Sequence, residues 1–115
     1  MKFVSIWKPD PRARSGAAPT EEQIAEMGRL VGELMSAGIL LDTGGVMSGG
    51  TSLRVRRAGS KITVTDGPFV ETKEVIGGFA VFNVKSKDGV IAAARRFVEI
   101  AGDGEAEIHE VSEFE

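Results

Sequence analysis

The residue of this sequence best suited to acid–base chemistry is Asp66, at the start of Asp66-Gly67-Pro68-Phe69. An aspartate in a turn normally accepts a hydrogen bond from the backbone N–H two residues further on. Here that residue is Pro68, which has no N–H, although the N–H of Phe69 remains available. A carboxylate held on a stiff turn is a candidate general base. We therefore predict Asp66 as a catalytic residue, with bracing of the loop as the alternative.

Charged residues follow Asp66 in the same stretch. Glu71 and Lys73 are candidate ligand-binding residues that can orient a polar molecule, and Glu71 shares a face with Glu74 if 70–76 forms a helical turn. The alternative is a solvated loop that carries a Glu–Lys pair. Carboxylates can also hold a divalent cation, but the sequence lacks the ligand spacing of a metal site, and we expect neither a metal nor a cofactor.

Two arginines precede the turn. Arg54 and Arg56 alternate along an expected strand and so share one of its faces. Arginine binds carboxylates in a bidentate manner, which suits an anionic substrate or the acidic C-terminal segment of a partner subunit. A charged hairpin that protects a sheet edge is the alternative.

Aromatic and histidine residues give two further candidates. Trp7 shares a strand face with Phe3 and Ser5, and we predict it as a ligand contact, with core or dimer interface as the alternative. The single histidine, His109, alternates with Glu107 in the last expected strand, which is typical of a surface or interface residue.

Composition excludes several classes of protein. The net charge of -3 argues against a nucleic-acid binder, which needs a basic surface. The absence of cysteine excludes disulfides and thiolate metal sites. No apolar run is long enough for a signal peptide or a membrane span, so we expect a cytoplasmic protein. Neither a phosphate-binding loop nor a Ser-His-Asp set can be drawn.

Hydrophobic periodicity predicts the elements that position these residues. The first helix has a Thr20–Gln23 capping box and ends at Gly38, and the second runs from Ser86 to Gly102. A strand pair around 58–60 forms a hairpin, with Leu53, Val55, Ile62 and Val64 as its inward set. The expected strands cover residues 2–8, 39–41, 52–57, 61–65, 79–84 and 105–114.

The order of these elements is typical of a ferredoxin-like β-α-β-β-α-β fold: an antiparallel sheet with two helices on one face, here with an inserted β-hairpin. We expect a single domain over residues 1–115. Strands 2–8 and 79–84 are apolar on both faces, yet the helices can cover only one. A second copy is the simplest cover for the other face, so we predict a homodimer that pairs through the sheet.

The sequence resembles the YCII-related family, and specifically its DGPF-domain branch. The resemblance rests on Asp66-Gly67-Pro68-Phe69, Glu71-Thr72-Lys73-Glu74 and Gly77-Gly78-Phe79. It implies a dimeric α/β barrel. Its superfamily includes small-molecule monooxygenases, muconolactone isomerases and a dechlorinating lactone enzyme. The branch has no general assigned reaction, and its members often occur beside extracytoplasmic-function sigma factors.

The resemblance does not transfer a mechanism. Better-known members carry a His and an Asp in the first half of the chain, whereas the only histidine here is His109. Two functions follow as hypotheses. The first is a cofactor-free acid–base enzyme or binder for a small anionic metabolite, with a pocket near Asp66. The second is a non-catalytic module that binds a protein partner in transcription regulation. A structural dimer without a ligand is the third possibility.

Overall fold

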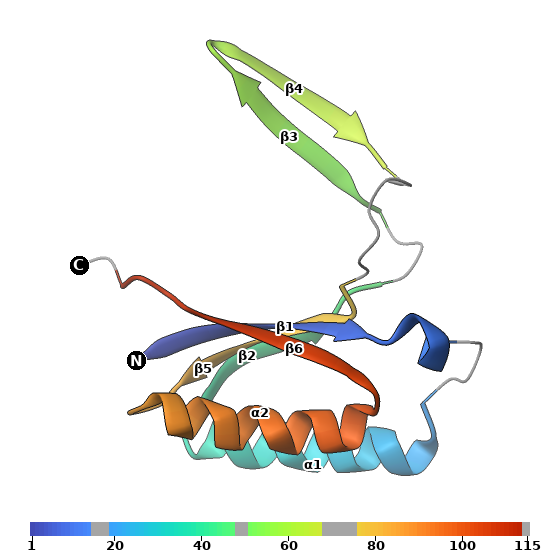
Figure 1. The fold of residues 1–115 in the computed structure, drawn as a ribbon, viewed down its shortest axis with the longest axis vertical. Helices are drawn as coiled ribbons and strands as arrows, with labels where there is room; N and C mark the ends of the chain where they lie inside the picture. The colour runs from blue at the N-terminus through green and yellow to red at the C-terminus, as the bar shows by residue number, and fades with distance from the viewer. Residues whose placement is uncertain (15–18, 48–50, 68–75, 114–115) are drawn as a thin grey trace.

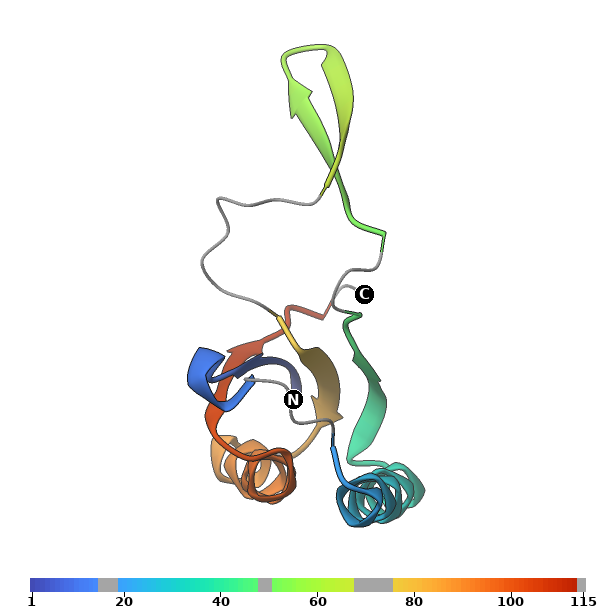
Figure 2. The same ribbon diagram turned by 90° about the vertical axis from the view of Figure 1, so that its right-hand side faces the viewer.

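A four-stranded antiparallel sheet with two helices on one face forms the main body of the protein. The computed structural model describes residues 1–14, 19–47, 51–67 and 76–113. The strand order is β2-β5-β1-β6, and both helices lie on the same side of the sheet (Figures 1 and 2). The elements are β1 (Lys2–Pro9), η1 (Pro11–Arg14), α1 (Glu21–Ser36), β2 (Leu40–Gly45), β3 (Leu53–Ala58), β4 (Lys61–Asp66), β5 (Gly78–Asn83), α2 (Lys87–Ala101) and β6 (Gly104–Glu110). The predicted ferredoxin-like fold with an inserted hairpin is confirmed.

Local signals in the sequence explain where the helices begin and end. The hydroxyl of Thr20 accepts a hydrogen bond from the Gln23 N–H at 3.1 Å, and the Gln23 side chain accepts one from the Thr20 N–H at 2.9 Å. This capping box satisfies two N–H groups that the helix leaves free. Gly38, with φ +75°, ends α1, and Ser86 caps α2 by accepting from the Gly89 N–H. Both predicted helices are confirmed.

The hydrophobic core lies between the helices and the sheet. Phe82 of β5 is its most buried large side chain, at 1% exposed, and its ring meets Phe97 of α2 edge to face with centroids 5.7 Å apart. Leu30 and Leu34 of α1 and Phe3 of β1 complete the packing. The helix-facing side of β1 is therefore the one with Phe3 and Ser5, which alternation places on one face without deciding which face meets the helices.

Two strand boundaries differ from the prediction. Strand β2 does not end at Leu41 but continues to Gly45, which pairs with Gly78. Glycines allow this close pairing, because a Cβ on Gly78 would lie 2.8 Å from the Gly44 carbonyl oxygen. Strand β6 ends at Glu110, earlier than predicted, although the Val111 N–H still donates to the Lys2 carbonyl oxygen at 2.8 Å.

The hairpin β3–β4 forms a separate two-stranded sheet, which we call the arm. It extends from the side of the main sheet opposite the helices (Figures 1 and 2). The predicted grouping of side chains on the two faces is confirmed, since Val55 lies opposite Val64 and Arg56 opposite Thr63.

The predicted inward set of the arm is wrong for the single chain. Its four aliphatic side chains are exposed by 52% (Leu53), 65% (Val55), 65% (Ile62) and 64% (Val64). Alternation determines which side chains share a face, but it does not determine what covers that face.

Candidate functional site

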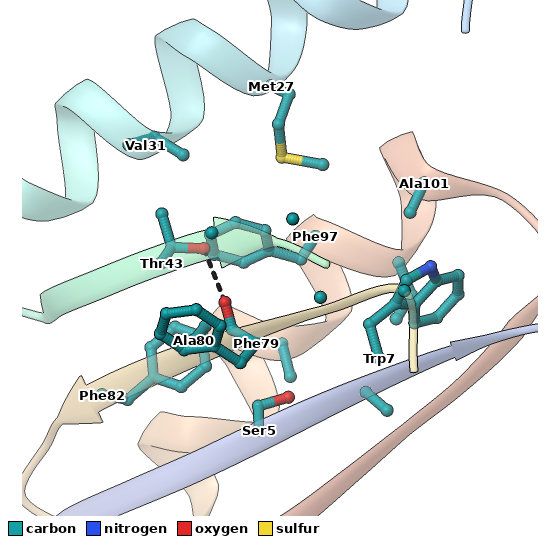
Figure 3. Close-up of a pocket in the computed structure, with 17 residues that line it drawn as sticks. Ser5, Trp7, Met27, Val31, Thr43, Phe79, Ala80, Phe82, Phe97 and Ala101 are labelled. Atoms are coloured by element: carbon teal, nitrogen blue, oxygen red, sulfur yellow. Dashed lines mark hydrogen bonds between the residues drawn. The ribbon is translucent and has the colours of Figure 1, made fainter. Parts of the chain in front are cut away.

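An apolar cavity lies between the two helices and the helix-facing side of the sheet. Its volume is about 320 Å³, and it lies where β1 ends and β5 begins (Figure 3). Apolar side chains from the sheet and from both helices contribute to its wall: Trp7, Met27, Val31, Phe82 and Phe97. Such a lining suits a small molecule with an apolar body.

Small residues create the space for this cavity. Gly45 of β2, Ala80 of β5 and Ala94 of α2 all contribute to its wall. At the same positions, larger side chains would fill the gap between helix and sheet as they do around Phe82. The pocket predicted from the sequence lies near Asp66, and a cavity between helix and sheet was not predicted. The signal that could have found it is the coincidence of small residues on facing elements.

Only a few polar groups reach the cavity. Of the hydroxyls, Thr43 donates to the Phe79 carbonyl oxygen at 2.8 Å and is therefore engaged (Figure 3). Ser5 is 7% exposed and lines the cavity, yet its hydroxyl makes no hydrogen bond to any residue that the structure describes. The indole N–H of Trp7 likewise has no partner among these residues. The described lining contains no charged side chain.

Two glycines hold Trp7 at the wall of the cavity. The N–H of Gly77 donates to the Trp7 carbonyl oxygen at 2.7 Å, and a Cβ at position 77 would lie 3.0 Å from Trp7 Cδ1. On the other side, a Cβ at position 104 would lie 2.6 Å from Trp7 Cη2. The indole therefore packs directly against backbone, which leaves it little freedom to turn.

The predicted site residues do not converge on this cavity. Trp7 lines it, whereas Arg54, Arg56 and Asp66 belong to the arm and are not part of its lining. Asp66 lies opposite Leu53, so it shares the face of the apolar side chains, and the two arginines share the other face. Glu71 and Lys73 fall outside the described residues. The catalytic role of Asp66 and the ligand-binding roles of the arginines stay predictions.

A second polar cluster lies on the side of the sheet that faces away from the helices. There Glu107 Oε2 is 3.3 Å from His109 Nε2 and 3.5 Å from Lys8 Nζ. The hydrogen bond from His109, followed by the charge of Lys8, lowers the pKa of Glu107 from its ordinary range. His109 is 60% exposed, and within the described ranges no three His, Asp or Glu side chains are grouped to hold a metal ion. This is a surface ion-pair cluster rather than part of the cavity.

Comparisons with known proteins were made on the whole chain. No helix in the described ranges is long and apolar enough to cross a membrane. Curated proteins give no match. Among solved structures, the chain is similar to a 5-chloro-2-hydroxyhydroquinone dehydrochlorinase from Burkholderia phenoliruptrix, solved with 2,5-dihydroxybenzoquinone. The TM-score is 0.53 at 14% identity, over 97% of this chain and 94% of that one. The YCII-related domain matches residues 1–115, and the chain therefore belongs to the YCII-related family.

Proposed function

We propose that this protein binds a small, uncharged molecule with a flat apolar ring in the cavity beside Trp7. The observation that carries the proposal is an apolar cavity of about 320 Å³ whose Ser5 hydroxyl has no partner among the described residues. Small-molecule sites are typically apolar clefts of roughly 300–1,000 Å³ with a few polar groups that orient the ligand. Ser5 and the Trp7 N–H are suited to bind an oxygen on the ring.

The lining favours a neutral ligand over the anionic metabolite expected from Arg54 and Arg56. A buried anion needs a cation or several hydrogen-bond donors, and the described lining offers no cationic side chain. The dehydrochlorinase with a related fold was solved with a six-membered ring compound, 2,5-dihydroxybenzoquinone. At 14% identity that likeness concerns the fold, so the ligand class proposed here rests on the lining of the cavity.

The proposal concerns ligand binding, and catalysis would need a further chemical group. The described lining holds no titratable carboxylate or imidazole that could move a proton. An acid–base enzyme would therefore need a group from outside the described wall, and Asp66 is our candidate for it. We also propose that the protein is cytoplasmic and that it belongs to the DGPF-domain branch of the family.

A non-catalytic protein-interaction module is the second candidate. The observation in its favour is the arm, whose aliphatic face is more than half exposed. Members of the branch that the sequence resembles often occur beside sigma factors, so a sigma factor is the candidate partner. It would bind the arm rather than the cavity.

The fluorescence of Trp7 allows a direct test, because it is the only tryptophan in the chain. Hydroquinone and benzoate serve as neutral and anionic ring probes of similar size. We expect hydroquinone to change the emission in a saturable way and benzoate to bind at least about tenfold more weakly, since a buried unpaired charge is costly. A bulkier side chain at the cavity, Ala94→Leu, abolishes the response, whereas Ala92→Leu, exposed on the same helix, leaves it intact. Absence of any saturable response to neutral rings would contradict the proposal.

A further inference from the structure

Two hydroxyl groups of the cavity lie in one row across the main sheet. Ser5 of β1 and Thr43 of β2 are both paired with Ala80 of β5, which lies between them. Residues directly opposite one another in a sheet share a face, and all three line the cavity (Figure 3). The row therefore places one hydroxyl on each side of a small methyl group, and both hydroxyls are on the helix-facing side of the sheet.

The neighbouring row leaves open space beside these hydroxyls. Gly78 of β5 is paired with Trp7 on one side and with Gly45 on the other, and all three line the cavity. Two of the three positions in this row therefore carry no side chain. A flat ring can lie on Ala80 and on the backbone of Gly78, with the indole of Trp7 beside it.

The two hydroxyls differ in what they can offer a ligand. The Thr43 hydroxyl donates to the Phe79 carbonyl oxygen at 2.8 Å, and its only hydrogen is thereby used. The lone pairs of Thr43 Oγ1 remain, so this hydroxyl can accept a hydrogen bond from a ligand but cannot donate one. Ser5 has no partner among the described residues, so its hydroxyl can donate or accept.

The spacing of the row suits a ring with oxygens at opposite ends. Paired Cα atoms of antiparallel strands are about 5 Å apart, so the Cα atoms of Ser5 and Thr43 are about 10 Å apart. This gap holds one aromatic ring with a hydrogen bond of about 2.8 Å at each end. Para oxygens point in opposite directions along the row and can reach both hydroxyls. Ortho oxygens point to the same side and can reach only one.

We propose that the cavity binds a para-substituted phenol that lies across Ala80. Its phenolic hydroxyl donates to Thr43 Oγ1, and an oxygen at the opposite end of the ring is bonded to the Ser5 hydroxyl. The ligand class, which rests on the ligand site proposed above, narrows from any neutral ring to a ring with two para oxygens, of which at least one is a hydroxyl. Thr43 determines this specificity, because an oxygen that can only accept would face its lone pairs.

The first test compares two isomers on the wild-type protein by isothermal calorimetry. Hydroquinone and catechol have the same size and the same two hydroxyls, in para and ortho positions. Hydroquinone should bind about three- to tenfold more tightly, the usual value of one additional hydrogen bond. Equal affinities would overturn the para geometry and leave the proposed ligand site intact. Absence of binding by both isomers would overturn the ligand site and the ligand class together.

The second test checks the direction of the hydrogen bond at Thr43. Thr43→Val keeps the shape of the side chain and removes Oγ1, so it should weaken hydroquinone binding about three- to tenfold. It should not weaken binding of 1,4-dimethoxybenzene, whose oxygens can only accept. Ser5→Ala should weaken binding of both rings, because the Ser5 hydroxyl can donate to either.

Two further variants separate hydrogen bonding from packing. Thr43→Ser keeps a hydroxyl that can donate to Phe79 and should restore hydroquinone affinity to within about twofold of the wild type. The matched control Thr63→Val makes the same substitution in the arm, outside the cavity lining, and should leave both affinities unchanged. Equal losses for hydroquinone and 1,4-dimethoxybenzene in Thr43→Val would overturn the assigned role of Thr43, since a packing defect affects both rings.

Discussion

The indole of Trp7 lies so close to the backbone of Gly104 that the strand β6 can carry no side chain there. A Cβ at position 104 would lie 2.6 Å from Trp7 Cη2 and 2.7 Å from the Lys8 carbonyl oxygen. Because the second contact is with backbone, rotation of the indole alone cannot relieve the clash. The glycine therefore determines both the pairing of β6 with β1 and the position of the ring in the cavity wall.

The first prediction concerns Gly104→Ala. We expect it to lower the free energy of unfolding by about 1–3 kcal/mol, as overpacking typically does, and to weaken hydroquinone binding by displacing the indole. Urea unfolding followed by Trp7 fluorescence measures the first effect. The matched control is Gly28→Ala in α1, where an added Cβ meets nothing within 4 Å, and which should stabilise the protein by up to about 1 kcal/mol. Equal stability of the Gly104 variant and the wild type would contradict the packing described here.

The second prediction concerns the hydroxyl of Ser5. Because it faces the cavity without a partner among the described residues, Ser5→Ala should weaken hydroquinone binding about three- to tenfold, the usual value of one hydrogen bond. The folded state should lose little, since no intramolecular hydrogen bond is removed. Isothermal calorimetry measures the affinity for hydroquinone and for benzene, a ring of similar size that lacks oxygens. The comparison separates the contribution of the hydrogen bond from that of packing. A similar loss of affinity for both rings would show that Ser5 acts through packing rather than through a hydrogen bond.

The third prediction concerns Asp66. Since Asp66 lies on the arm and does not line the cavity, Asp66→Asn should change hydroquinone affinity by less than about twofold. If Asp66 braces the loop, the melting temperature of the variant falls with no change in binding. If Asp66 acts on an anionic metabolite, a melting-shift screen detects a ligand that stabilises the wild type and not the variant. A large loss of hydroquinone affinity would instead place Asp66 at the cavity.

The fourth prediction concerns the pH dependence of the ion pair between the helices. Arg96 of α2 donates two hydrogen bonds to the Glu33 carboxylate of α1, and these bonds, followed by the charge of Arg96, lower the pKa of Glu33 from its ordinary value of 4.5. A carboxylate whose pKa is lower in the folded state stabilises the fold above its unfolded pKa, and this contribution is lost as the pH falls through the folded value. The wild type should therefore exceed Glu33→Gln in stability near neutral pH, and the difference should shrink below about pH 4.5.

Urea midpoints at pH 6 and pH 3 measure that difference. Both side chains are about half exposed, so 1 M NaCl should reduce it at pH 6 by screening. A difference that grows on acidification would have the wrong sign for this ion pair.

The sequence by itself determined the elements and their order. Capping at Thr20 and Ser86, the glycine at position 38 and the alternation along β1 and β3–β4 are local signals, which act over a few residues and do not depend on distant contacts. The β-α-β-β-α-β order with right-handed crossovers then leaves few ways to build an antiparallel sheet with both helices on one face. The motif around Asp66, Gly77 and Gly78 was sufficient to indicate the family.

Only the tertiary structure decided where the cavity lies and that the aliphatic face of the arm is exposed. The cavity depends on small residues from β2, β5, β6 and α2 that are distant in sequence and meet only after packing. The packing of Trp7 against Gly77 and Gly104 brings together β1, β6 and the residue before β5 in the same way. The exposure of the arm depends on where the hairpin leaves the main sheet. The hydrophobic periodicity of the sequence does not predict that position. Local propensity acts within an element, whereas the space between elements is a property of their packing, and the candidate site is such a space.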